Sequence, residues 1–137
     1  YNRWIARTEG NSLAHAILRG YQDTSGRSFP NYHYEDLLFI AQQYLDRGLV
    51  NPAILVDTNH NNSNKQFAEQ PRIGLEVMRS RQSSELIRDT VRGLMVESYL
   101  VEGQQSVEDG VFGKSITDPC LGWVDSERFV KELAERV

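Results

Sequence analysis

Four ionisable side chains stand at the ends of four short apolar runs, and together they could hold a cation and an anion. The runs end at Arg19, His60, Glu97 and Asp118. One imidazole and two carboxylates suit a divalent ion of borderline or hard character, such as Mn, Fe, Co or Zn. A guanidinium beside them suits a phosphate or a carboxylate, which it grips with paired hydrogen bonds. These residue types predict a metal or anion site, provided that folding brings the four ends together.

Each of these residues also has a structural explanation that involves no ligand. A histidine at the end of a strand often only makes a local hydrogen bond, and Glu97 and Asp118 could be helix N-caps or surface carboxylates. Arg19, which precedes Gly20, could be a solvated charge. Core packing alone gives no reason for four successive runs to end in an ionisable residue. This coincidence favours a functional site.

The four runs predict strands of a parallel sheet. They are rich in Ile, Leu and Val without strict alternation, which is typical of strands buried on both faces. Their ranges are 15–19, 53–60, 94–97 and 115–118. Parallel strands in an α/β fold open their carboxyl ends on one face. Four neighbouring strands would therefore bring the four side chains to one mouth.

Three longer stretches predict helices at residues 34–47, 66–90 and 126–137. In the first, Leu37, Ala41 and Leu45 recur at helical spacing, and Gly48 is a plausible C-terminal stop. Segment 98–114 holds three glycines and predicts a long loop with at most a short helical turn. Strands alternating with helices are typical of a single α/β domain with a parallel sheet.

Composition narrows the class of protein further. The chain has 137 residues, and 15 Lys and Arg against 19 Asp and Glu give a net charge of −4, which argues against non-specific binding of nucleic acid. No apolar run approaches the roughly 18 residues that a bilayer span requires, so no membrane partner is expected. The one cysteine, Cys120, excludes a disulfide scaffold within the chain and favours a reducing, cytoplasmic location.

Four longer segments around these strand ends resemble class I 3-deoxy-D-arabino-heptulosonate 7-phosphate (DAHP) synthase. They read AILRGY, ILVDTNHNNSNKQF, GLMVESYLVEGQQS and GKSITDPCLGW. The resemblance covers nearly the whole chain, from about Trp4 to the terminal helix, and such long, ordered motifs are hard to meet by chance. Two departures are visible. The PNY at 30–32 follows a longer loop than in many relatives, and DTNHNN replaces the more familiar DxSHAN but keeps its histidine.

The resemblance implies a (β/α)8 barrel that condenses phosphoenolpyruvate with erythrose 4-phosphate in the first step of the shikimate pathway. It also implies a divalent metal held by a Cys, a His, a Glu and an Asp. His60 of the DxxH motif, Glu97 of MVES and Asp118 of SITD match metal ligands, and His60 thereby lies at the catalytic centre. Arg19 of ILRG matches the arginine that helps to hold the phosphate of phosphoenolpyruvate. Cys120 matches a cysteine of the family that is not the metal ligand.

Other parts of the family's site have no match, among them the metal cysteine and the basic loop that grips phosphoenolpyruvate. A barrel takes about 250 residues, and the chain starts at Tyr1 rather than Met. We therefore expect residues 1–137 to be one partial domain, the C-terminal half-barrel with about four parallel strands, and its N-terminal half to be missing. Open sheet edges predict a homo-oligomer, and the chain by itself is expected to be inactive. One alternative is a half-barrel that serves as a non-catalytic interaction or regulatory module. Another is a different metal-dependent barrel lyase.

Overall fold

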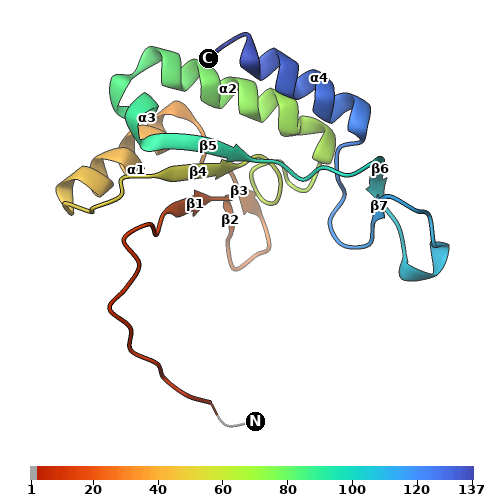
Figure 1. Ribbon diagram of the computed structural model, residues 1–137, viewed down its shortest axis with the longest axis horizontal. Helices are drawn as coiled ribbons and strands as arrows, with labels where there is room; N and C mark the ends of the chain where they lie inside the picture. The colour runs from red at the N-terminus through yellow and green to blue at the C-terminus, as the bar shows by residue number, and fades with distance from the viewer. Residues whose placement is uncertain (1–2) are drawn as a thin grey trace.

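A parallel sheet lies at the centre of the fold, and helices pack against one of its faces (Figure 1). The computed structural model describes residues 3–137. The sheet has the strand order β1-β4-β5, with β1 at Ala16–Leu18, β4 at Ile54–Asp57 and β5 at Val91–Met95. β4 is parallel to both neighbours and pairs Val56 with Leu18 and with Leu94. The predicted mixed α/β fold with parallel strands is confirmed.

Helices form in each of the three stretches where the sequence predicts them, but their ends differ from the predicted ones. α1 is Tyr34–Asp46, and Gly48 follows it with the left-handed φ of 57° that suits a C-terminal stop. The predicted single helix over 66–90 is wrong. A short 3-10 turn, η1 (Phe67–Glu69), leads into α2 (Gln70–Ser83), and α3 (Glu85–Thr90) follows. Ser84 separates these two helices with an extended backbone and accepts a hydrogen bond from the Ile87 N–H as the cap of α3.

The closing helix α4 is Trp123–Ala134 and begins earlier than the predicted residue 126. Figure 1 shows α4 beside α2, on the same side of the sheet. Their contact is close at Gly74 of α2, where an added Cβ would lie 2.3 Å from the ring of Phe129 in α4. Glycine is needed at this position because the two helices leave no room for a side chain.

The core lies between the sheet and α1 to α3, and it is made of aliphatic side chains from both layers together with one tyrosine that precedes α1. Its members are Leu18, Tyr32, Leu37, Ala41, Ile54, Val56, Ile73, Val77, Ile87 and Val91. The opposite face of the sheet is more open, and Ile17 on it is 42% exposed. The sequence pattern predicted strands buried on both faces, whereas within residues 3–137 helices cover only one.

The fourth predicted strand does not join this sheet, which within the described residues has three strands. β7 (Lys114–Ser115) instead pairs in parallel with β6 (Val101–Gln104), a strand that the sequence pattern did not predict. Between them lies the predicted short helical turn, η2 (Val107–Asp109). Residues 98–121 form a separate lobe beyond β5, called the 98–121 lobe below (Figure 1). Within the described residues, β7 pairs only with β6, in a sheet separate from the main one.

A small antiparallel hairpin follows β1, made of β2 (Tyr21–Gln22) and β3 (Ser28–Phe29). It lies between β1 and the Pro30 that precedes α1. Its base is tight, because a Cβ on Gly20 would lie 2.7 Å from the carbonyl oxygen of Phe29 and 2.8 Å from the backbone of Asn61. The hairpin thereby packs on the loop after β4.

Within residues 3–137, no helix has the length and apolar character to cross a membrane.

Candidate metal centre

Three of the four predicted site residues converge on one point. Ligand atoms of His60, Glu97 and Asp118 lie within 4.8 Å of one another. The Nε2 atom of His60 is 3.4 Å from Oδ2 of Asp118 and 3.7 Å from Oε1 of Glu97. The three residues follow β4, β5 and β7, and all are partly buried. The geometry supplies one imidazole nitrogen and two carboxylates facing a shared space.

His60 is held by Asp57, a residue that sequence reasoning did not select. Asp57 ends β4 and is 1% exposed, and its Oδ2 atom is 2.7 Å from Nδ1 of His60. Its Oδ1 accepts a hydrogen bond from the backbone N–H of Asn59. Because Nδ1 faces this carboxylate, Nε2 is the ring nitrogen that is turned to the cluster. The signal in the sequence was the DxxH spacing, which brings both side chains to one turn.

Glu97 is placed by Gln70, a fully buried residue of α2 that sequence reasoning also missed. The Oε1 atom of Gln70 accepts from the Glu97 N–H at 2.8 Å, and its Nε2 donates to the Glu97 carbonyl at 2.9 Å. Its Oε1 also accepts from the hydroxyl of Thr58 at 3.1 Å. One side chain thus ties the end of β5 to the loop after β4. No simple spacing in the sequence identifies it, because the contact spans 27 residues.

Asp118 reaches the cluster from the 98–121 lobe. The Asn59 amide donates to the carbonyl of Pro119 at 3.3 Å, and the Leu121 N–H donates to the carbonyl of Glu97 at 2.9 Å. These bonds hold the loop after β7 against the ends of β4 and β5. The carboxylate itself is paired on its outer side, where Nζ of Lys65 lies 3.2 Å from Oδ1.

Arg19 lies beside the cluster but is not a member of it. It follows β1, and its Nε atom is 3.9 Å from Oδ2 of Asp57, the same oxygen that faces His60. Its side chain is 54% exposed, so most of the guanidinium remains open to a ligand. The structure therefore brings all four predicted residues to one end of the sheet, with Arg19 linked to the others through Asp57.

Cys120 is a buried thiol. Its side chain is 4% exposed, and Sγ donates to the carbonyl of Asp118 at 3.3 Å. Burial, as the largest cause, raises the pKa of the Cys120 thiol above its ordinary value, and the neighbouring carboxylate of Glu97 acts in the same direction. A thiol kept protonated in this way is a poor nucleophile and a poor metal ligand.

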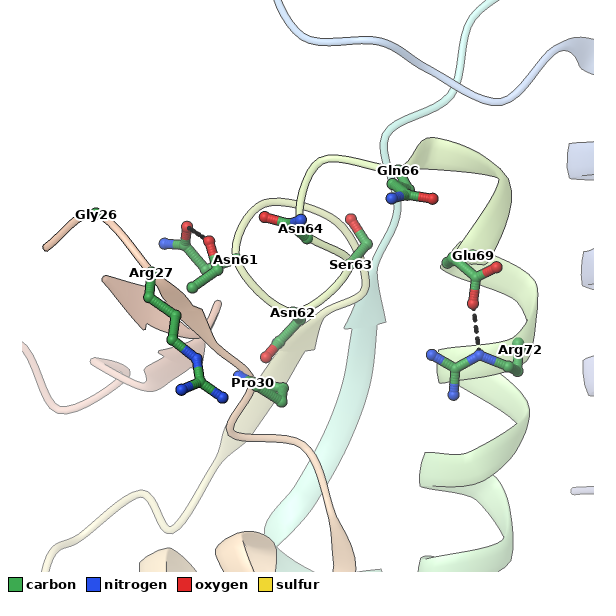
Figure 2. A pocket seen from close by; sticks show the side chains of 11 residues that line it. Gly26, Arg27, Pro30, Asn61, Asn62, Ser63, Asn64, Gln66, Glu69 and Arg72 are labelled. Atoms are coloured by element: carbon green, nitrogen blue, oxygen red, sulfur yellow. Dashed lines mark hydrogen bonds and ion pairs between the residues drawn. The ribbon is translucent and has the colours of Figure 1, made fainter. Parts of the chain in front are cut away.

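The loop that carries His60 continues into the wall of a second, polar hollow of about 630 Å³. Figure 2 shows Arg27 of the β2–β3 hairpin on one side, Asn61 to Asn64 in the middle, and Glu69 with Arg72 of α2 on the other side. Arg72 is held by Glu69 at 2.6 Å, and this pairing raises the pKa of its guanidinium further above its ordinary value. The side chain of Asn62 is occupied, since it donates to the carbonyls of Leu18 and Asp57. The hollow lies outside the metal cluster.

Comparisons with known proteins agree on one family. The model of the DAHP synthetase I family matches residues 2–131. The Trp-sensitive phospho-2-dehydro-3-deoxyheptonate aldolase of Buchnera aphidicola subsp. Baizongia pistaciae is 40% identical over 97% of this chain and 36% of its own length. The Phe-sensitive enzyme of Escherichia coli K12 is 38% identical over the same shares. A solved structure of the aldolase from Francisella tularensis SCHU S4 superposes with a TM-score of 0.78 at 28% identity, covering 95% of this chain and 36% of that one. The chain thus spans about 36% of the length of these relatives.

Proposed function

The chain belongs to the DAHP synthetase I family, and we propose that it contributes the metal-binding part of a DAHP synthase site. The reaction is the condensation of phosphoenolpyruvate with erythrose 4-phosphate, the first step of aromatic amino acid biosynthesis. One observation carries the proposal. His60, Glu97 and Asp118, which come from three separate segments, lie within 4.8 Å of one another in a chain of this family.

The donor set fits a divalent ion. His60 offers Nε2, because Nδ1 is turned to Asp57, and the two carboxylates face that nitrogen at 3.4 and 3.7 Å. A nitrogen and two carboxylate oxygens suit Mn, Fe, Co or Zn. Bound there, the ion would act as a Lewis acid on the aldehyde oxygen of erythrose 4-phosphate. Asp57 would keep the imidazole in the productive tautomer, as carboxylates behind metal-bound histidines commonly do.

Arg19 would hold the phosphate of phosphoenolpyruvate beside this ion. Its guanidinium is half exposed, and its nearest carboxylate, Asp57, is 3.9 Å away and shared with His60. A contact this long leaves the paired N–H groups free for a phosphate, which matches their geometry. Catalysis would then depend on orienting two phosphorylated substrates and on neutralising their charge.

We further propose that residues 1–137 are one partial domain, the C-terminal half of a (β/α)8 barrel. Three parallel strands with helices on one face, and an opposite face on which Ile17 and Met95 stay partly exposed, are what an opened barrel would present. The N-terminal half would supply the remaining ligand and the other phosphate-binding residues. Homo-oligomerisation and a cytoplasmic location stay predictions, as does the expectation that the isolated chain gives no turnover.

The test is a calorimetric titration of the chain with Mn²⁺, with and without phosphoenolpyruvate. We expect one ion per chain with micromolar affinity, lost in Asp118→Ala and retained in Asp89→Ala, which removes an exposed carboxylate of α3. Phosphoenolpyruvate should tighten the binding, and Arg19→Ala should remove that effect. A wild-type chain that binds no Mn²⁺ would contradict the proposed site and favour a non-catalytic module.

A further inference from the structure

One cation of the chain contacts the metal cluster from its outer side. Nζ of Lys65 lies 3.2 Å from Oδ1 of Asp118, while Oδ2 of the same carboxylate faces His60. Among residues 3–137, no other lysine or arginine has a side-chain nitrogen within 4.0 Å of a carboxylate oxygen of Glu97 or Asp118. The two oxygens of Asp118 are therefore divided between the ligand cluster and a lysine.

The backbone around Lys65 is unusual, and it sets the point from which the lysine side chain leaves the loop. The non-glycine residues with positive φ in the described part of the chain are His60 at 46°, Asn64 at 53° and Lys65 at 60°, all in this loop. Asparagine tolerates this region, whereas a lysine there is uncommon and costly. The Lys65 N–H donates to the carbonyl of His60 at 2.7 Å, which closes the turn. The same turn thus carries both a ligand of the cluster and the lysine that pairs with Asp118.

Charge balance gives this arrangement a consequence. Glu97 and Asp118 place two carboxylates around the imidazole of His60, and like charges at such distances repel when no cation lies between them. The ammonium of Lys65 offsets one of these charges. A divalent ion that binds in the cluster neutralises both carboxylates, so the charge of the lysine is no longer needed there. The ion and the ammonium also repel each other, because both are positive.

We propose that Lys65 is a built-in counter-ion of Asp118, which keeps the ligands together before a metal arrives and which the metal must outcompete. This inference rests on the proposed metal site and adds a residue that sets its affinity. Lys65 stabilises the ion-free form and thereby weakens the binding of the ion. Because its side chain is 61% exposed, it has room to turn away from Asp118 without disturbing the core.

The experiment compares Mn²⁺ affinity, measured by calorimetry at low ionic strength, in the wild-type chain, Lys65→Met and Lys65→Arg. The uncharged variant should bind Mn²⁺ about two- to fivefold more tightly, the size that an exposed ion pair of ordinary strength gives. Lys65→Arg should resemble the wild type. Lys131→Met is the matched control, because it removes an exposed lysine that pairs with Glu127 on α4 at 2.7 Å, and it should leave the affinity unchanged.

Two further readouts separate this role from a purely structural one. The tightening should shrink at high salt, which screens charges, and the ion-free Lys65→Met chain should unfold at a lower temperature than the wild type. A residue that only shaped the loop would lower stability and ion affinity together. Equal or weaker binding by Lys65→Met, or equal tightening by Lys65→Arg, would overturn the inference while leaving the metal site intact. A wild-type chain that binds no Mn²⁺ would instead contradict the metal site and this inference with it.

Discussion

The two regions that supply the candidate ligands are held in opposite ways. The loop after β4 and the first residue of α2 form a buried polar network, in which Asp57, Thr58, Asn59 and Gln70 are each at most 1% exposed. The 98–121 lobe is mostly exposed, with Phe112 at 89% and Val107 at 70%. His60 and Glu97 are fixed by the first region, and Asp118 is supplied by the second.

This difference shows which part of the site is held rigidly. Buried polar groups are stable only when hydrogen-bonded, and among the described residues none of the side-chain atoms of this network lacks a partner. The lobe is tied to the network by a few bonds, such as those from Asn59 to Pro119 and from Leu121 to Glu97. We infer that one side of the site is set by folding of the core, whereas the other is completed by docking of the lobe.

The largest effect should come from the network. Gln70→Ala should lower the free energy of unfolding by about 2–4 kcal/mol, because it leaves the backbone N–H of Glu97 without its acceptor and opens a cavity. Urea denaturation measures it. Arg79→Ala, on the exposed side of the same helix, should change stability by less than about 0.5 kcal/mol. Equal losses in the free energy of unfolding would show that the buried network contributes no more to stability than the surface of α2 does.

Asp118→Asn should separate ion binding from stability. Removing one of the ligands should weaken Mn²⁺ binding more than about 100-fold, beyond the usual loss when only a ligand's hydrogen-bond partner is removed. The free energy of unfolding of the ion-free chain should fall by no more than about 1 kcal/mol, because the substitution removes only an ion pair with the exposed Lys65. Calorimetry and urea denaturation give the two values. A large loss of stability would show that the lobe is part of the cooperative core.

Asp57→Asn should weaken Mn²⁺ binding by about 10- to 100-fold, the usual size for a residue that orients a metal-bound histidine. The amide carries no charge to polarise the imidazole of His60, although it occupies the same space. Asp89→Asn on α3 serves as the control and should bind the ion as the wild type does. Unchanged affinity in Asp57→Asn would mean that Asp57 acts only in folding.

The smallest effect is expected at the tip of the lobe. Phe112→Ala should change the free energy of unfolding by less than about 0.5 kcal/mol, because an exposed side chain has little packing to lose. Phe39→Ala on α1 is a matched control at 67% exposure. A loss above about 1.5 kcal/mol for Phe112 alone would show that this ring is covered in solution, as self-association would require.

Sequence patterns located all three strands of the main sheet, and they selected His60, Glu97 and Asp118 as candidate ligands. They failed for residues 115–118, which were expected to form a fourth strand of the sheet. Asp118 nevertheless reaches the cluster, because bonds between Leu121 and Glu97 and between Cys120 and Gly103 carry its loop there. A strand run predicts an extended backbone, but it does not say which edge will accept its hydrogen bonds.

The sequence by itself determined the residue types at the strand ends, the parallel α/β pattern, and the family, since apolar runs and their polar ends are local features of the chain. Only the tertiary structure decided which groups hold these ligands. Gln70 bonds to Glu97 across 27 residues, and Lys65 pairs with Asp118 across 53. Such partners follow from how helices and loops pack on the sheet, and no local spacing encodes a hydrogen bond between segments that meet only when the core has formed.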